Sequence, residues 1–230
     1  MSKNIEICLY IYMKYNIKIP TSLNDVTLRQ YQKFSQLNKD LENKQDSEIQ
    51  LKIVEIFCNV PQRVVRKMKA TDITEICQIV NGMFDDNYQL INRFKLNGVE
   101  YGFIPELDDM SFGEYMDLDS FIGDNDNLHR AMNVLFRPIQ MKKGNRYYLK
   151  EYDSESSEVA KDFPMDVVMG SIVFFYTLGQ ELSTVMMNYS ANKNRQILVE
   201  HLLSQPNGDG LIHSMQSLTA ILQDLNISLS

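Results

Sequence analysis

The chain has 230 residues, of which 44% are apolar, and its formal net charge is −7. This composition excludes a disordered chain, and the negative charge argues against a nucleic-acid binder that neutralises many phosphates. The longest apolar run, residues 167–178, is shorter than the roughly 20 residues of a membrane-spanning helix, and the N-terminus lacks a signal-peptide cleavage pattern. We therefore expect an intracellular protein that is not embedded in a membrane. Cys8, Cys58 and Cys77 lie in apolar surroundings and are expected to be buried, reduced thiols.

The N-terminal segment alternates between apolar and polar residues. Every odd position from Ile5 to Ile19 is apolar, whereas the even positions are largely polar or amphipathic. A period of two residues is typical of a strand with one buried face. We therefore predict a single long strand that ends at Pro20 and is long enough to bend or to reach a neighbouring subunit.

Helical signals follow this strand up to residue 84. The Ser/Thr-x-x-Gln pattern of a capping box occurs at residues 27–30 and again at 47–50. Apolar residues recur at helical spacing behind both boxes. Pro61 fits the first turn of a short helix through Met68, and Thr71 opens another helix. This third of the chain is predicted to be an array of helices.

Two hairpins are predicted in the middle of the chain. Asn97-Gly98 lies between alternating residues, and this pair favours a type I′ turn because both central residues adopt positive φ. Gly144-Asn145 predicts a second hairpin over residues 139–152. Between the hairpins, a capping box at residues 111–114 opens a helix to about Ile122. A second helix there is expected to end at Arg137-Pro138.

The remaining chain is predicted to be a loop over residues 153–161 followed by helices. The helix that begins at Pro164 has no polar face and should lie at the centre of the fold. The predicted fold class is mainly α (α+β), a multi-helix array with an N-terminal β-strand and two β-hairpins. We expect a single domain over residues 1–230, with subregions at 1–90, 91–152 and 164–230. The last two helices are expected at 194–205 and 211–225, with a loop between them.

The sequence shows no catalytic or cofactor-binding motif. Its histidines and cysteines lack the spacing that places two metal ligands on one helix face. No Gly-rich phosphate loop, nucleophile elbow or dinucleotide fingerprint is present. We therefore expect no enzyme activity, no cofactor and no metal. The alternative is an enzyme whose site is assembled from distant residues, such as His129 with Asp117 or Asp119.

Acidic and basic residues separate between residues 106 and 150. Acids without Lys or Arg fill residues 106–128, and bases without acids follow up to Lys150. Solvated faces are the commonest meaning of such runs, and a calcium loop at residues 124–127 is disfavoured by His129 at the turn position. A third interpretation is head-to-tail self-assembly between an acidic and a basic surface. The residues of these two surfaces are Asp108, Asp109, Asp117 and Asp119, and Lys142, Lys143 and Arg146.

Several stretches occur together in a fixed order. They are NGVEYGFIPEL (97–107), SFGEY (111–115), AMNVLFRP (131–138) and VMGS (168–171) leading into Phe174-Phe175. This order resembles uncharacterised proteins from the structural-gene modules of tailed bacteriophages, including relatives of the crAss-like phages of gut Bacteroidetes. The first third, with residues 28–34 followed by the short helix at 61–68, resembles tail assembly chaperones.

The resemblance implies a non-enzymatic role in phage morphogenesis, most similar to a tail assembly chaperone that binds apolar segments of tail proteins. The alternative is a virion component such as a head–tail connector or ring protein. The expected location is the host cytoplasm during assembly, or the virion. The expected partners are phage tail or connector proteins and further copies of the chain, with neither nucleic acid nor membrane. Partner-binding residues are expected at Met186, Met187, Tyr189, Leu211, Met215, Leu218 and Leu222.

Overall fold

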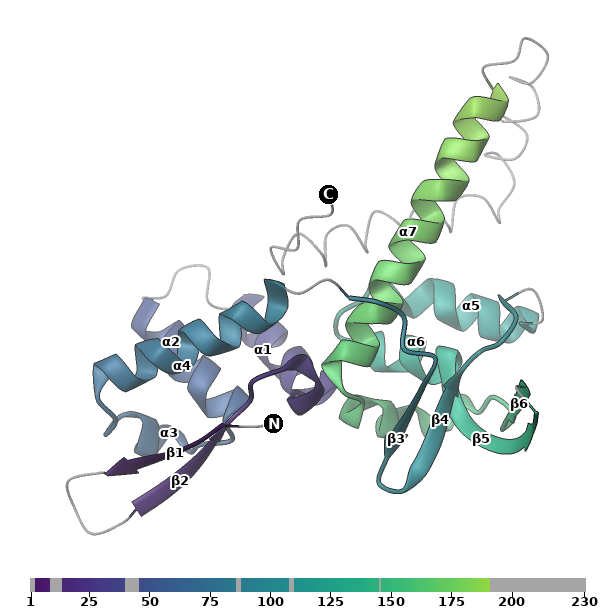
Figure 1. Ribbon diagram of the computed structural model, residues 1–230. Helices are drawn as coiled ribbons and strands as arrows, with labels where there is room; N and C mark the ends of the chain where they lie inside the picture. The colour runs from purple at the N-terminus through teal and green to yellow at the C-terminus, as the bar shows by residue number, and fades with distance from the viewer. Residues whose placement is uncertain are drawn as a thin grey trace. The chain divides into compact units, whose positions relative to one another are not determined.

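The structure is a computed structural model in which helices predominate and two small antiparallel sheets are present (Figure 1). It describes residues 3–8, 14–39, 46–85, 88–107, 110–144 and 146–190. The predicted fold class, mainly α with additional β structure, is confirmed. The chain divides into two compact units, and each is described by itself. Of the described residues, unit 1 contains those up to 85 and 161–166, and unit 2 contains 88–160 and 167–190.

Unit 1 consists of a two-stranded sheet and a set of short helices. The core is formed by α2 and α4, whose buried residues include Val54, Phe57, Ile76 and Val80. The elements are β1 (Lys3–Cys8), β2 (Lys14–Ile19), η1 (Leu23–Asp25), α1 (Leu28–Lys39), α2 (Asp46–Phe57), α3 (Gln62–Val65), α4 (Ala70–Gly82) and η2 (Met83–Asp85).

The N-terminal segment forms two strands, so the prediction of one long strand was wrong. β1 and β2 pair antiparallel, with Ile5 opposite Ile17. Odd positions are paired with odd positions between the two strands, so the apolar alternation of the sequence is the same as that of one long strand. Ile17 and Ile19 are buried and Lys18 is exposed, which agrees with a period of two residues.

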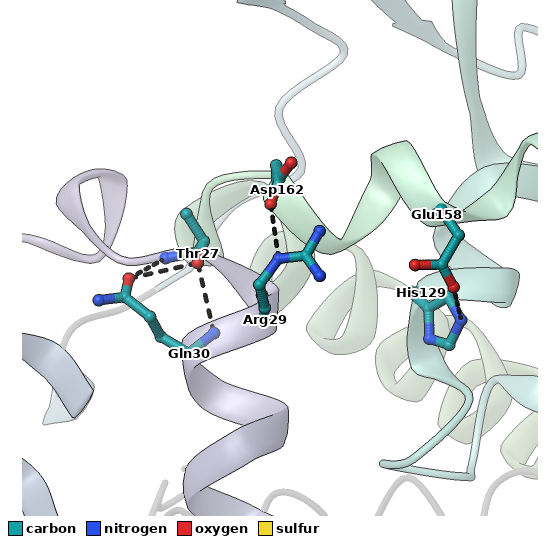
Figure 2. A network of polar contacts seen from close by, with 6 residues as sticks. All are labelled: Thr27, Arg29, Gln30, His129, Glu158 and Asp162. Atoms are coloured by element: carbon teal, nitrogen blue, oxygen red, sulfur yellow. Dashed lines mark hydrogen bonds and ion pairs between the residues drawn. The ribbon is translucent and has the colours of Figure 1, made fainter. Parts of the chain in front are cut away.

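Polar contacts fix the start of α1 (Figure 2). The predicted capping box is present, because the Thr27 backbone N–H donates to Gln30 Oε1 at 2.9 Å and the Gln30 backbone N–H donates to Thr27 Oγ1 at 3.3 Å. The same Gln30 side chain donates through Nε2 to the carbonyl of Ile56 at 2.8 Å and so ties α1 to α2. Arg29 Nε donates to Asp162 Oδ1 at 2.9 Å, but this pair is exposed and contributes little stability.

A distant segment, residues 161–166, completes unit 1. The Leu28 backbone N–H donates to the carbonyl of Phe163 at 3.0 Å, and the Met165 backbone N–H donates to the carbonyl of Val26 at 2.9 Å. Leu28, Phe163 and Met165 are almost fully buried. The first turn of α1 is therefore held by backbone hydrogen bonds to residues that lie more than half the chain away.

Two predictions for the helices of unit 1 need correction. Ser47 lies inside α2, which includes Asp46, so it does not cap this helix. Pro61 occupies the N-cap position of α3, and this helix ends at Val65. The chain continues only as turns to Met68, because the carbonyls of residues 64 and 65 accept hydrogen bonds three residues ahead.

Two cysteines of unit 1 are buried and free. Burial raises the pKa of the Cys58 thiol to about 12, with a smaller contribution from Cys77, and burial raises the pKa of Cys77 to about 11. Thiols with such values are almost entirely protonated near neutral pH and are poor nucleophiles. The prediction of buried, reduced thiols is confirmed for these two residues, and the side chain of Cys8 lies outside the described part.

Unit 2 is built on a four-stranded antiparallel sheet with the order β3-β4-β5-β6. The helices α5 and α6 pack against each other, and α6 leads directly into β5. The elements of this part of the chain are β3 (Arg93–Leu96), β4 (Val99–Phe103), α5 (Phe112–Phe121), α6 (Leu128–Leu135), β5 (Phe136–Lys143), β6 (Arg146–Leu149), η4 (Ser154–Asp162) and α7 (Met165–Ser190).

Both predicted hairpins are present in the sheet. Asn97 and Gly98 have φ values of 48° and 81°, as a type I′ turn requires. The second hairpin starts earlier than predicted, because Arg137 and Pro138 belong to β5 and pair with Gly102 and Tyr101. We predicted that these two residues end a helix, but α6 stops just before them.

The predicted loop at residues 153–161 was also wrong, since residues 154–162 form the 3₁₀ helix η4. Asp153 stabilises its first turn, because the carboxylate accepts hydrogen bonds from the Glu155 backbone N–H at 3.0 Å and from Ser156 Oγ at 2.6 Å. This stretch is strongly polar, so its sequence has no apolar periodicity that predicts a helix. The helices predicted at 194–205 and 211–225 lie outside the described residues.

Aromatic rings from the sheet and α7 form the core of unit 2. The Phe103 ring centroid lies 5.2 Å from that of Phe136 and 5.7 Å from that of Phe174, both in edge-to-face contacts. The apolar helix was predicted to lie at the centre of the fold; its residues 167–172 are buried, whereas residues 173–178 are half-buried or exposed. Gly170 on this helix packs against the backbone of residues 89–90.

Tyr147 of β6 lies across the sheet over Gly102. A Cβ atom at Gly102 would lie 2.6 Å from Tyr147 Cε2, so only glycine leaves room for the ring. The Tyr147 hydroxyl donates to the carbonyl of Phe103 at 2.6 Å. This contact connects the edge strand β6 to β4, two strands away.

We expect Tyr147→Phe to destabilise the protein by about 1 kcal/mol, because it removes a half-buried hydrogen bond and keeps the ring. Tyr148→Phe is the matched control, since this neighbouring hydroxyl is exposed, and it should change the free energy of unfolding by less than about 0.5 kcal/mol. Urea unfolding of both variants measures the difference. Equal stability of the two variants would show that the hydroxyl contact contributes nothing.

Candidate protein-binding surfaces

α5 turns a charged residue inward and two large apolar residues outward. Glu114 and Leu118 are each 7% exposed, whereas Phe112 is 70% and Met116 is 52% exposed. Residues four positions apart share one face of a helix, so Glu114 and Leu118 form the inner face and the other two form the opposite one. We call Phe112 and Met116 the α5 outer face. Two adjacent exposed apolar side chains on a helix mark a candidate contact surface.

Glu114 is held inside by Ser111 and Arg137. The predicted capping box is present: the Ser111 backbone N–H donates to Glu114 Oε2 at 2.7 Å, and the Glu114 backbone N–H donates to Ser111 Oγ at 3.3 Å. The other carboxylate oxygen, Oε1, lies 2.7 Å from Nη1 of Arg137 of β5, whose side chain is 13% exposed. These contacts fix the rotation of α5 about its axis, and that rotation presents the outer face to solvent.

The surroundings of Glu114 favour its charged form. Burial by itself raises its pKa, but the hydrogen bonds from Ser111 and the Arg137 guanidinium outweigh burial and hold the pKa below the ordinary value of 4.5. A carboxyl group with a lowered pKa in the folded state stabilises that state above its unfolded pKa. This contribution is lost as the pH falls through the folded pKa.

We therefore expect the wild-type protein to be more stable than Glu114→Gln near neutral pH, by an amount that shrinks as the pH falls below about 4.5. Urea unfolding of both proteins between about pH 7 and pH 3 tests this expectation. At acidic pH the protonated glutamic acid and glutamine are nearly equivalent, so the two stabilities should converge. A stability difference that stays constant over this range would contradict the role of the carboxylate charge.

Acidic residues lie beside the α5 outer face in the sequence of α5. Asp117 Oδ2 accepts a hydrogen bond from the Tyr152 hydroxyl at 2.7 Å, and burial together with this contact raises the pKa of Tyr152. Burial and the negative charge of Asp119 raise the pKa of Tyr115. No Lys or Arg occurs in residues 110–127. The described part of α5 therefore presents apolar side chains beside acidic ones, and Arg130 of the neighbouring α6 lies over the Phe121 ring, 5.1 Å from its centroid.

The hairpin of β5 and β6 carries a second exposed apolar pair. Met141 and Tyr148 lie opposite each other in the register and are 56% and 48% exposed. Lys143 and Arg146 also lie opposite each other and are exposed. Alternate residues of a strand share a face, so all four side chains are on the same side of the hairpin. We call these four residues the hairpin patch, which combines apolar surface with positive charge.

Lys142 belongs to the opposite side of this hairpin. Its Nζ lies 2.6 Å from Glu100 Oε2 of β4. A side-chain hydrogen bond from Lys142 and, more weakly, its positive charge lower the pKa of Glu100. Lys142 is therefore neutralised within its own chain, and the free positive charge of the hairpin is concentrated in the patch.

No protein-family model, curated protein or solved structure matches this chain. Both candidate surfaces belong to unit 2, which is one compact part of the molecule.

The residues predicted from the sequence are distributed as follows. Asp117 and Asp119 lie on α5, and Lys142, Lys143 and Arg146 lie on the β5–β6 hairpin. Met186, Met187 and Tyr189 are in the last part of α7, where the backbone but not the side chains is described. The other predicted residues, Asp108, Asp109, Leu211, Met215, Leu218 and Leu222, lie outside the described residues.

The exposed apolar residues of the two surfaces were not predicted from the sequence. A signal for α5 was available, because the capping box fixes its start, and Leu118 with Ile122 then defines the inner face. Phe112 and Met116 fall on the opposite side of that face. No comparable signal marked Met141 and Tyr148, because the bulge near residues 139–141 shifts the alternation of β5.

Two residues considered from the sequence for catalysis and for calcium, His129 and Asp124, have partners within the chain. Among them, no group of three or more His, Cys, Asp or Glu side chains is placed to hold a metal ion. His129 is buried, and its Nε2 lies 4.0 Å from Glu158 Oε1 (Figure 2). Asp124, at the start of the sequence considered for calcium, accepts hydrogen bonds from the Asp126 backbone N–H and the Asn127 side chain in the turn before α6. None of the helices in the described ranges has the length and apolarity needed to span a bilayer.

Proposed function

We propose that this chain is a non-enzymatic assembly protein that works by binding other proteins, and that the α5 outer face is one of its contact sites. The observation that carries this proposal is the exposure of Phe112 and Met116 on a helix whose opposite face is fixed by the Glu114–Arg137 ion pair. A side chain on a rigid helix loses little conformational freedom when a partner covers it. Burying its apolar area then contributes about 25 cal/mol per Å² to binding.

Within this class, we propose a role in bacteriophage morphogenesis, most like that of a tail assembly chaperone. The order of the sequence motifs supports this role, and so does the exposed apolar surface. Such a chaperone would bind apolar segments of a tail protein in the host cytoplasm until polymerisation displaces it. Reversible binding of an amphipathic helix requires only an apolar surface of this kind.

The second candidate is a virion component such as a head–tail connector or ring protein. The hairpin patch favours this candidate, because a ring needs two different surfaces that complement each other. A chaperone requires only one binding surface. The two candidates therefore differ in whether the chain remains in the finished particle.

Quantitative mass spectrometry on the phage that encodes the chain would separate these candidates. We expect the protein to be abundant in infected cells and absent from purified virions if it is a chaperone. A fixed, ring-like copy number in virions would contradict the chaperone role and support the role of a structural component. Absence from both infected cells and virions would contradict a role in morphogenesis.

The contact site can be tested on the purified chain with the tail tube and tape-measure proteins of the same phage. We expect Phe112→Ser/Met116→Ser to weaken binding at least tenfold, which corresponds to about 1.4 kcal/mol. Val159→Ser is the matched control, because Val159 is 47% exposed and lies in η4, outside both surfaces. If the double variant binds as tightly as the control, the α5 outer face is not the contact site.

A further inference from the structure

β6 is the last strand at one edge of the four-stranded sheet (Figure 1). In the described part of the chain it pairs with β5 alone. The Lys150 backbone N–H, just beyond β6, donates to the carbonyl of Pro138 of β5 at 2.9 Å. Successive residues of an antiparallel strand direct their backbone groups to alternate sides, so those of Tyr147 and Leu149 point away from β5. The outer edge of β6 therefore presents the N–H and C=O groups of these residues to an additional strand.

The side chains at the turn end of β6 carry positive charge. Lys143 and Arg146 lie opposite each other, and both are exposed. Like charges directly opposite each other in a sheet are destabilising. Among the described residues, no carboxylate forms an ion pair with either side chain. An acidic side chain placed beside Arg146 offsets this repulsion.

The other end of β6 carries charges of both signs. Lys150 and Glu151 follow the strand and are exposed. Asp153 lies two residues further along the chain, where local hydrogen bonds and, more weakly, the positive charge of Lys150 lower its pKa. The positive charge that favours an acidic partner is therefore concentrated at Arg146.

The opposite edge of the sheet, β3, differs in its charges. Arg93 and Lys95 are exposed, but their charges act on Glu100 of the neighbouring strand β4. A hydrogen bond from Lys142 lowers the pKa of Glu100 most, and the positive charges of Arg93 and Lys95 lower it further. The cations of β3 thus act on an acidic group in the next strand, which distinguishes them from the cations of the hairpin patch.

We propose that β6 is a docking edge for an extended, acidic segment of another protein, which joins the sheet as an additional strand. One acidic residue of this segment lies beside Arg146. An apolar residue two positions along lies beside Tyr148, which is 48% exposed on the same face. Main-chain hydrogen bonds to Tyr147 and Leu149 supply affinity, and the alternate side chains supply specificity. This site goes beyond the proposed function, because it does not include the α5 outer face.

Two other occupants fit this edge less well. Pairing of β6 with the β6 of a second copy brings the cations of both hairpins together, and positive charge on edge strands prevents such association. Nucleic acid has phosphates for Arg146 but lacks peptide groups for Tyr147 and Leu149. An acidic peptide segment matches both the charge and the backbone of the edge, so the edge selects it against the alternatives.

A synthetic peptide of about ten residues, the length of a long strand, tests the proposal. It alternates threonine with glutamate, phenylalanine and glutamate, and it carries a fluorophore for anisotropy measurements. We expect it to bind the full chain with a Kd on the order of 100 µM. A peptide with lysine in place of glutamate, and another with proline in place of threonine, should bind more weakly by roughly tenfold or more. Proline removes the N–H groups that donate to the edge.

Charge reversal on the protein gives the decisive result. Lys143→Glu/Arg146→Glu should lose roughly tenfold or more in affinity for the acidic peptide and should bind the lysine peptide instead. This gain of binding cannot come from a variant that fails to fold. Lys95→Glu on β3 is the matched control and should bind the acidic peptide as the wild type does. When the acidic peptide binds the wild type, the amide hydrogens of Tyr147 and Leu149 should become protected from exchange in NMR spectra.

Three kinds of result would overturn the proposal. Equal affinity for the three peptides, or no binding at roughly 1 mM, shows that β6 is not a docking edge. Binding without protection of Tyr147 and Leu149 places the peptide on another surface. An oligothymidylate that binds more tightly than the peptide assigns the edge to nucleic acid, and a dimer in which both amides are already protected assigns it to a second copy. The α5 variants and the virion analysis test the proposed function separately, so either proposal can fail without the other.

Discussion

Gly170→Ala is expected to destabilise the protein by about 3 kcal/mol, the upper part of the range for overpacked cores. A Cβ atom at this position would clash with the carbonyl oxygen of Gln89 and would lie 2.9 Å from its carbonyl carbon. The obstacle is backbone, so it cannot move aside by changing rotamer, and α7 must shift away from residues 89–90. Thermal unfolding should show a decrease of roughly 10 °C in Tm for a chain of this size.

Gly113→Ala provides the matched control for this substitution. Gly113 is also a helical glycine, but a Cβ atom at this position would meet nothing within 4 Å. Alanine favours the helix by up to about 1 kcal/mol relative to glycine, so this variant should be as stable as the wild type or more stable. If Gly170→Ala behaves like Gly113→Ala, then the close contact between α7 and residues 89–90 is not a feature of the folded protein.

Arg137→Met is expected to destabilise the protein by about 3 kcal/mol, because it leaves the buried Glu114 carboxylate without its cation. The methionine side chain preserves much of the buried volume, so the loss should be mainly electrostatic. Adding Glu114→Gln to this variant removes the stranded charge and should recover part of the stability. Urea unfolding of the two single variants and the double variant gives the interaction energy of the pair.

Lys142→Met tests whether burial is the reason for this effect. The Lys142–Glu100 pair is as short as the Glu114–Arg137 pair, at 2.6 Å and 2.7 Å, but it is much more exposed. Exposed ion pairs contribute little to stability, so Lys142→Met should be nearly neutral. Similar losses of stability for Arg137→Met and Lys142→Met would show that burial does not determine the contribution of an ion pair here.

Local sequence signals predicted most of the elements that the structure describes. The capping boxes at residues 27–30 and 111–114 and the turn at Asn97-Gly98 were confirmed, because each depends on contacts within four residues. The N-terminal segment shows the limit of periodicity. A strand and a hairpin with odd-to-odd pairing give the same alternation, and only the tertiary pairing of Ile5 with Ile17 distinguishes them.

The candidate site was predictable only in part. Charge segregation indicated α5 and the β5–β6 hairpin, but the sequence alone did not identify which charges are used within the chain. Glu114 meets Arg137 and Lys142 meets Glu100 across 23 and 42 residues of sequence. These pairings depend on how α5 rotates and on the register of the sheet. The rotation and the register are set by tertiary packing, which local propensity does not predict.

The completion of unit 1 by residues 161–166 has a consequence for the order in which the protein matures. A chain is made from its N-terminus, and domains normally begin to fold as soon as they leave the ribosome. The backbone partners of Val26 and Leu28 are Met165 and Phe163, so they emerge only after the whole stretch 88–160 has been synthesised. The first turn of α1 must wait for them. The two units therefore finish folding in an interleaved order, with the N-terminal one completed late.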